Sequence, residues 1–251
     1  MLLLVLRGVL WGAPTPSPSD PSRLIQTPAA KVALNGRLLS DVRRFPSGCS
    51  VLLEVDRVGA GWAKGRTELQ LSDCSAPLLQ GWHVQSTGLL RSPMPGAHPL
   101  LPGSAERLAR QGSWSRLRVD SIEVLRRPWT PLADLRRDVA QRLQQAVGPR
   151  RGGFLAALVL GSAQVQLPDD LRQAFRVAGL SHALAASGFH LSVLLGSVLM
   201  LSRRWPPGLR LPLAAMALLL FVCLAGAQPS VVRAVLMAAT ALLIRESGHH
   251  S

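Results

Sequence analysis

The sequence lacks the motifs of the common catalytic sites. It has no H-E-x-x-H zinc motif, no phosphate-binding P-loop, no G-x-S-x-G turn and no paired-carboxylate site. Its three cysteines form no C-x-x-C pair and no Cys/His zinc spacing. These absences predict a protein that is not an enzyme, with no catalytic residue, no bound metal and no cofactor.

Lysine is nearly absent as well. Only Lys31 and Lys64 are lysines, so arginine supplies almost all of the net charge of +14. One interpretation is a GC-rich genome together with basic flanks of membrane segments. The other is a surface that attracts polyanions. The arginines are scattered rather than clustered, which favours the first interpretation.

Hydrophobic residues make up 48% of the chain and concentrate after Phe154. This distribution predicts a soluble part followed by a membrane part. Three apolar stretches are candidate spanning helices, because a span takes about 20 apolar residues. They cover approximately residues 180–202, 211–227 and 230–244.

Before the soluble part, residues 1–12 form a partial transmembrane or signal-like segment that Arg7 interrupts. Residues 13–30 are rich in proline and serine, which predicts a linker without regular structure.

Residues 31–127 show the alternation of a small β domain. A change of phase in the last strand predicts a bulge near Asp120–Ser121, and Gly59–Gly65 is a hairpin-like connection. Five strands in this length are typical of a small barrel of the OB type. The predicted strands are Lys31–Leu39, Ser50–Val58, Arg66–Ser72, Gly81–Leu90 and Ser115–Leu125.

Two of the cysteines, Cys49 and Cys74, flank two predicted strands. A disulfide between them is compatible with a domain that faces an oxidising compartment, and free thiols are the alternative. Cys223 lies in an apolar run and is interpreted as a small buried hydrophobic residue.

An OB barrel can bind single-stranded nucleic acid through a basic groove and stacking aromatic side chains. The alternative is that the tryptophans pack in the core or at the rim, because no aromatic residue recurs at alternate strand positions. The candidate DNA-binding residues are Arg37, Arg43, Arg44, Arg57, Trp62 and Trp82.

Polar residues interrupt the first candidate span. Imidazoles inside a membrane are costly unless they face protein or water, so they predict a functional path. A metal held by His182 and His190 is an alternative. The polar track that we predict consists of His182, Ser187, Gly188, His190 and, near the start of the third span, Arg233.

Further helices are predicted around these spans. Thr130–Val147 is amphipathic and lies either on a membrane surface or against the barrel. The segment Gly152–Gly161 is apolar but short, which favours a buried or re-entrant helix. Pro168–Ala178 is a second amphipathic helix, and Gly179 fits its C-cap.

Two sequence landmarks resemble the ComEC family of competence proteins. They are LRQAFRVAGLSHALAASGFHLSVLLG, residues 171–196, and GAQPSVVRAVLM, residues 226–237. The resemblance implies an α+β membrane protein, with a small OB-like β-barrel domain followed by a transmembrane α-helical bundle. Residues 128–251 would be the competence-type membrane domain.

The resemblance also implies a function in DNA uptake during natural transformation, as part of a channel for single-stranded DNA across the inner membrane. His182, Ser187, Gly188, His190 and Arg233 then become candidates for the DNA path. The implied partners are single-stranded DNA, membrane lipid, and further competence proteins or other copies of the chain.

The charge pattern predicts an orientation. Arg203, Arg204, Arg210 and Arg245 follow the first and third spans, and the positive-inside rule places them in the cytoplasm. The β domain is then extracytoplasmic on a multi-pass protein of the plasma (inner) membrane. The family usually continues with more spans and a metallo-β-lactamase-like domain, whereas the sequence ends at Ser251. The alternative function is therefore a truncated, non-transporting fragment or a split subunit that needs a partner.

Overall fold

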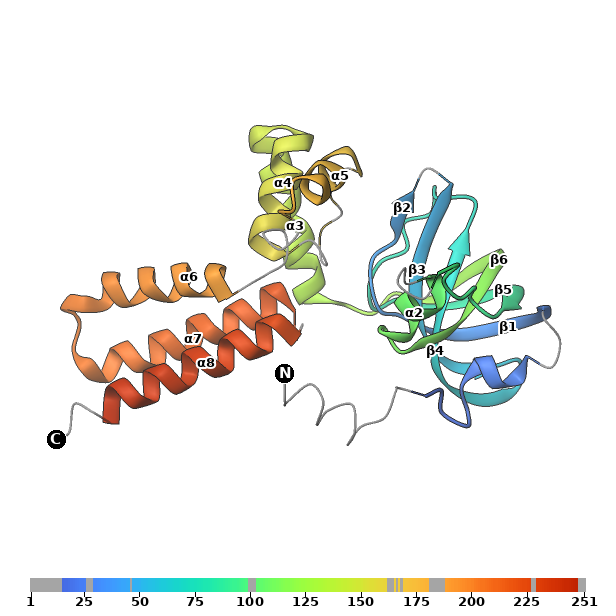
Figure 1. Ribbon diagram of the computed structural model, residues 1–251, viewed down its shortest axis with the longest axis horizontal. Coiled ribbons are helices and arrows are strands. Elements are labelled where there is room, and N and C mark those ends of the chain that lie inside the picture. The colour runs from blue at the N-terminus through green and yellow to red at the C-terminus, as the bar shows by residue number, and fades with distance from the viewer. Residues whose placement is uncertain are drawn as a thin grey trace. The chain divides into compact units, whose positions relative to one another are not determined.

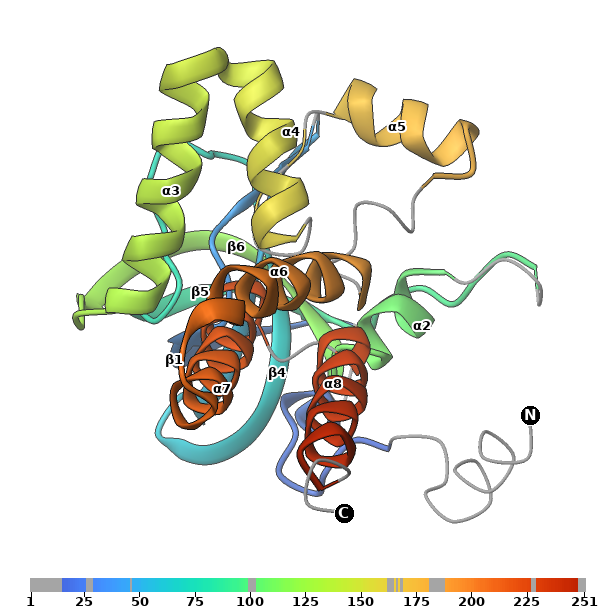
Figure 2. The same cartoon turned by 90° about the vertical axis from the view of Figure 1, so that its left-hand side faces the viewer.

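The computed structural model describes residues 15–25, 29–45, 47–98, 103–161, 165, 167, 169–180, 188–226 and 229–247. The predicted segment 1–12 lies outside these residues. The chain divides into two compact units, Met1–Thr130 and Pro131–Ser251, close to the predicted boundary between 127 and 128. Figure 1 shows the strands of the first unit and the helices of the second, and Figure 2 shows the same elements from the side.

Strands dominate the first unit. They are β1 (Ala29–Leu38), β2 (Arg43–Phe45), β3 (Gly48–Val58), β4 (Gly61–Leu71), β5 (His83–Arg91) and β6 (Ser113–Arg126), with the short helices η1 (Pro21–Leu24) and α2 (Ser104–Ala109). The strands pair in the order β1-β5-β6-β4-β3-β2, and β1 also pairs with β3. The extra pairing closes five strands into a ring. The sixth strand, β2, lies outside the ring and pairs with the start of β3. The predicted OB-like barrel is confirmed.

The predicted strands match β1, β3, β4, β5 and β6, and the predicted bulge is confirmed. Thr87 pairs with Ser121 and Gly88 with Val119, which leaves Asp120 as the extra residue of β6. The predicted connection over residues 59–65 is too long, because β4 already begins at Gly61. The sequence pattern does not predict β2 and α2, which are three and six residues long.

Alternate strand residues form the barrel core, as period-two burial requires. Each strand of the ring contributes at least one fully buried leucine, among them Leu34, Leu53, Leu69, Leu90 and Leu117. Polar groups inside the barrel are paired. The hydroxyls of Thr67 on β4 and Ser115 on β6 lie 2.8 Å apart and share a hydrogen bond.

The 3-10 helix η1 lies within the predicted linker, so the expectation of no regular structure there is wrong for Pro21–Leu24. The Asp20 side chain caps it by accepting from the Ser22 amide at 2.9 Å, and proline at the first position favours the turn. A Cβ at Gly65 of β4 would lie 2.3 Å from Asp20 Oδ2. The glycine therefore makes room for this segment against the barrel.

Cys49 at the start of β3 forms a disulfide with Cys74 in the loop after β4, with the Cα atoms 5.9 Å apart. Asp73 orders this loop, because its carboxylate accepts from the Ser75 hydroxyl at 2.6 Å and from the Ser75 amide at 2.9 Å. These hydrogen bonds hold the pKa of Asp73 below its usual value. Of the two readings of the cysteines, the structure selects the disulfide.

The second unit begins with a helical hairpin, α3 (Pro131–Val147) and α4 (Pro149–Leu160). A Cβ at Gly152 would lie 2.3 Å from the Leu143 carbonyl oxygen, so this glycine lets the two helices approach closely. Helix α5 (Asp169–Val177) packs on α4 through Phe175 and Phe154, whose ring centroids are 5.3 Å apart. Gly179 has φ +70° after α5, as the predicted C-cap requires.

Three apolar helices complete the second unit: α6 (Gly188–Leu201), α7 (Pro207–Ala225) and α8 (Pro229–Ser247). They share a small core of Leu191, Ala214, Leu218, Phe221, Ala225 and Val231. Among the described residues, only the 18 residues Gly208–Ala225 of α7 are long and apolar enough to cross a membrane. The apolar part of α8, Val231–Ala241, is shorter. The described residues thus contain one of the three predicted spans as a candidate. Parts of the other two lie among residues whose backbone or side chains are not described, so these two remain predictions.

Candidate functional site

The tip of the β3–β4 hairpin holds two of the predicted DNA-binding residues side by side. Arg57 on β3 pairs across the ladder with Trp62 on β4, and its guanidinium carbon lies 6.0 Å from the centroid of the indole ring. The Trp62 side chain is 83% exposed. An exposed indole with an arginine beside it offers a face on which a nucleobase can stack.

The other predicted arginines of the barrel lie elsewhere. Arg43 and Arg44 belong to β2 and pair with residues at the start of β3, whereas Arg57 lies at its end. At about 3.3 Å per residue, Ser50 and Arg57 are roughly 23 Å apart along the strand. Arg37 pairs with Glu54 across the β1–β3 ladder. The six candidates thus do not form one groove.

Trp82 fits the packing alternative better than the stacking one. It is half-buried and packs against the core cluster of the barrel. The guanidinium carbon of Arg127 lies 4.9 Å from the centroid of its ring, within the range of a cation–π contact. One ring face is therefore already occupied.

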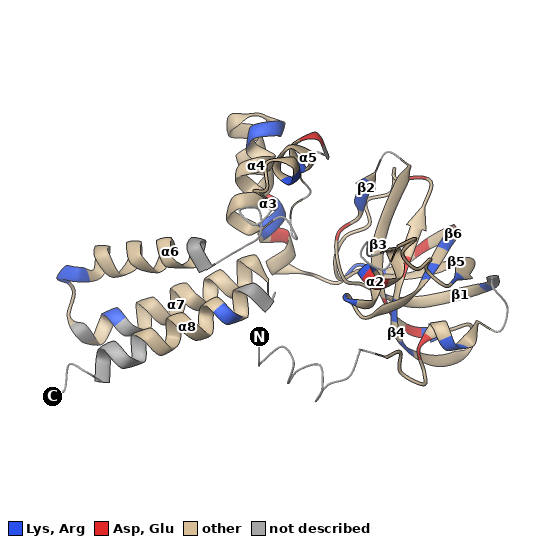
Figure 3. Ribbon diagram, in the orientation of Figure 1, with Lys and Arg blue, Asp and Glu red and all other residues tan. Residues whose placement is uncertain are grey.

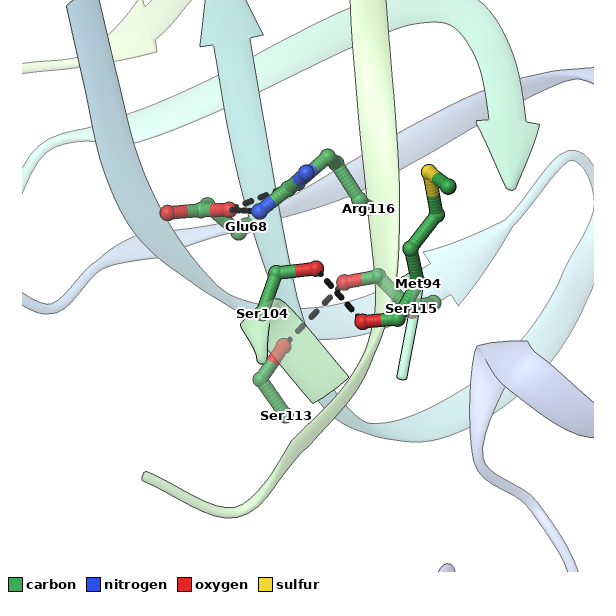
Figure 4. A network of polar contacts seen from close by, with 6 residues as sticks. All are labelled: Glu68, Met94, Ser104, Ser113, Ser115 and Arg116. Carbon is green, nitrogen blue, oxygen red and sulfur yellow. Dashed lines mark hydrogen bonds and ion pairs between the residues drawn. The ribbon is translucent and has the colours of Figure 1, made fainter. Parts of the chain in front are cut away.

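Oligonucleotides bind OB barrels on the face formed by the second and third barrel strands in chain order. Among the five strands of this ring, those are β3 and β4. This face carries both signs of charge, since Glu54 on β3 pairs with Arg66 on β4. Figure 4 shows Arg116 of β6 turned toward Glu68 of β4, where Nε and Nη2 donate to Oε2 at 2.8 and 2.7 Å. Because Arg116 is already paired with Glu68, it is a poor ligand for a phosphate group. The hairpin tip is therefore the best candidate surface for binding DNA.

The predicted polar track of the helical unit is only partly visible. His182 and Ser187 lie outside the described residues, while Gly188 and His190 belong to the first turn of α6, where the side chains are not described. The track and the metal alternative at His182 and His190 therefore remain predictions.

Arg233 can be placed on α8. Val231 is fully buried in the core of the three helices, whereas Arg233 is exposed and shares its face with Leu236 and Met237, which are 62% and 67% exposed. The arginine thus lies on the side of α8 that α6 and α7 do not cover. In a membrane this position needs water or protein around the guanidinium group.

Arg136 is a structural contact that the sequence pattern does not reveal. From α3 it reaches the last turn of α7, where its Nη2 donates to the Cys223 carbonyl oxygen at 2.5 Å. The last carbonyls of a helix have no intrahelical donor, and a cation is favourable at that end. Arg136 therefore caps the candidate spanning helix, and only the three-dimensional fold brings the two positions together.

Comparisons with known proteins agree with the sequence landmarks. The family model of the competence proteins matches residues 158–250, which include both landmarks. ComE operon protein 3 of Bacillus subtilis (strain 168) is 30% identical over 167 residues, which cover 62% of this chain and 21% of the relative. The chain thus spans about a fifth of the length of that protein.

Among solved structures, aspartyl tRNA synthetase from Entamoeba histolytica shows 12% identity over 76% of this chain and 38% of its own, with a TM-score of 0.30. A score this low does not show a shared fold. The family match and the curated relative agree with each other, and both support a competence protein of the ComEC family.

Proposed function

We propose that the chain is a membrane component of DNA uptake in natural transformation and forms part of a channel for single-stranded DNA across the plasma membrane. The observation that carries this proposal is the competence family match over residues 158–250, which covers α6, α7 and α8. The proposed path is lined by the polar track, and no covalent chemistry is assigned to this chain.

Exposed apolar side chains support membrane insertion of the helical unit. The stretch Gly208–Ala225 of α7 is strongly apolar on average, and Met216 and Leu219 within it are 61% and 64% exposed. Apolar surface of this kind is typical of contact with lipid or with further helices. The unit would then be part of a multi-pass bundle.

The disulfide supports an extracytoplasmic barrel. Disulfides such as Cys49–Cys74 form and persist in oxidising compartments outside the cytoplasm. The arginines after α6 point to the same orientation by the positive-inside rule.

Deleting the gene in the organism that carries it should abolish entry of labelled DNA into the cytoplasm, and the unchanged chain should restore it. Labelling either strand separately shows whether a single strand enters. A Leu219→Arg variant should fail to restore uptake, because a charge on the exposed face of α7 opposes insertion. Leu219→Ile is the matched control and should restore it. Normal uptake in the deletion strain would contradict the proposal.

At the barrel, Trp62→Ala should weaken binding of a fluorescent oligo-dT by about 5- to 150-fold, because stacking contributes about 1–3 kcal/mol per base. Fluorescence anisotropy of the full chain in detergent measures the affinity. Trp129→Ala is the matched control, since Trp129 is 85% exposed and lies beyond β6. Equal affinities of the Trp62 variant and the unchanged chain would remove the hairpin tip as a DNA site.

A further inference from the structure

The turn that joins α6 to α7 combines exposed apolar and basic side chains. We define this turn as residues 200–210. Met200 and Leu201 are 77% and 86% exposed at the end of α6, and Trp205 is 50% exposed. Arg203 and Arg204, between them, are also exposed. Figure 3 shows basic residues on this turn and none coloured as acidic.

A third arginine organises the turn. Arg210, in the first turns of α7, donates through Nε to the Trp205 carbonyl oxygen at 2.9 Å and through Nη2 to the Arg203 carbonyl oxygen at 2.6 Å. These two bonds fix the backbone that carries Arg203 and Arg204. Within the described part of the chain, the guanidinium groups of Arg203 and Arg204 have no hydrogen-bond acceptor or ion-pair partner. They are therefore available for an external anion.

We propose that the α6–α7 turn binds the headgroups of anionic phospholipids at the surface of the membrane. The inference rests on the membrane insertion proposed above and adds the lipid class. Tryptophan sits favourably at the level of the headgroups, and each arginine near an anionic leaflet is attracted to it. In this arrangement Leu201 and Met200 enter the acyl region below the arginines.

Nucleic-acid phosphates would also attract the two arginines. They would leave Met200 and Leu201 in water, however, because a phosphate backbone offers no apolar surface to long aliphatic side chains. A lipid interface accommodates the basic and the apolar part of the turn together. The combination favours lipid over nucleic acid.

The test uses the fluorescence of Trp205 in the full chain, reconstituted into vesicles of phosphatidylcholine and phosphatidylglycerol. Subtracting the signal of a Trp205→Phe variant isolates this tryptophan from the other five. Brominated phosphatidylglycerol and brominated phosphatidylcholine are compared as quenchers at equal mole fraction. Flotation after alkaline carbonate washing measures insertion separately.

We expect brominated phosphatidylglycerol to quench Trp205 more strongly than brominated phosphatidylcholine. In an Arg203→Gln/Arg204→Gln variant, the enrichment of phosphatidylglycerol over phosphatidylcholine around Trp205 should fall by roughly fivefold for each arginine removed. An Arg142→Gln/Arg151→Gln variant removes the same charge from α3 and α4 and should leave the Trp205 signal unchanged.

Equal quenching by both lipids in the unchanged chain would overturn the proposal, and so would an inserted chain whose Trp205 neither lipid quenches. Binding of an oligonucleotide to phosphatidylcholine vesicles that depends on Arg203 and Arg204, without any preference for phosphatidylglycerol, would assign the turn to nucleic acid instead. A chain that fails to float after the carbonate wash contradicts membrane insertion itself, which separates the two failures.

Discussion

Replacing Cys49 and Cys74 with serine is expected to lower the free energy of unfolding of the barrel by about 3.5 kcal/mol. The bridge closes a loop with a sequence separation of 25 residues, and the entropy that it removes from the unfolded chain gives this magnitude. For a domain of this size the loss corresponds to a fall in Tm of about 15–25 °C. Near-UV circular dichroism of the full chain in detergent follows the melting of the barrel through its tryptophans.

Cys223→Ser is the matched control for this prediction, because Cys223 is a free cysteine on α7, in the other unit. It should leave the melting of the barrel unchanged. Reducing the disulfide of the unchanged chain should lower the Tm of its barrel to that of the double variant. A double variant with the same Tm as the unchanged chain would show that the disulfide contributes nothing to the stability of the barrel.

Replacing Arg233 with leucine is expected to reduce DNA uptake by at least about ten- to hundredfold, the equivalent of one lost hydrogen bond to a charged group. The reason is the proposed path, in which the guanidinium group meets the phosphates of the strand. Insertion should be retained, because leucine is more favourable in a membrane than arginine. The measurements are the transformation frequency and the amount of the protein in the membrane fraction.

Arg233→Lys keeps the positive charge and should retain a substantial part of the uptake. Leu236→Ala changes the same exposed face of α8 without changing its charge and should have little effect. Transformation at normal levels in the Arg233→Leu variant would show that the polar track does not carry DNA.

Local sequence pattern predicts the elements of this protein well, because alternation and helical period depend on neighbouring residues. The barrel strands, the bulge at Asp120 and the C-cap at Gly179 are all of this kind. The pattern fails for β2, which is three residues long and holds its place only by pairing with β3. It also fails for η1, where the capping by Asp20 outweighs a linker composition.

The candidate sites are harder to predict, because they depend on which strands and helices become neighbours. Arg43 and Arg57 are close in sequence to other basic residues, yet Arg43 on β2 pairs near the start of β3 and Arg57 lies near the end of β3. Glu68 and Arg116 meet only because β4 and β6 pair in parallel. The contact from Arg136 to the Cys223 carbonyl likewise joins residues 87 positions apart.

The position of β6 also sets the order in which the barrel can be completed. This strand lies between β4 and β5, although it follows both in the chain. While the chain emerges from its N-terminus, β1, β3 and β4 can pair and Cys74 can reach Cys49 before Ser113–Arg126 is available. Until then β4 and β5 each expose an unpaired edge. The disulfide can therefore hold an incomplete sheet in register, and the last strand closes the ring just before the first helix of the second unit is made.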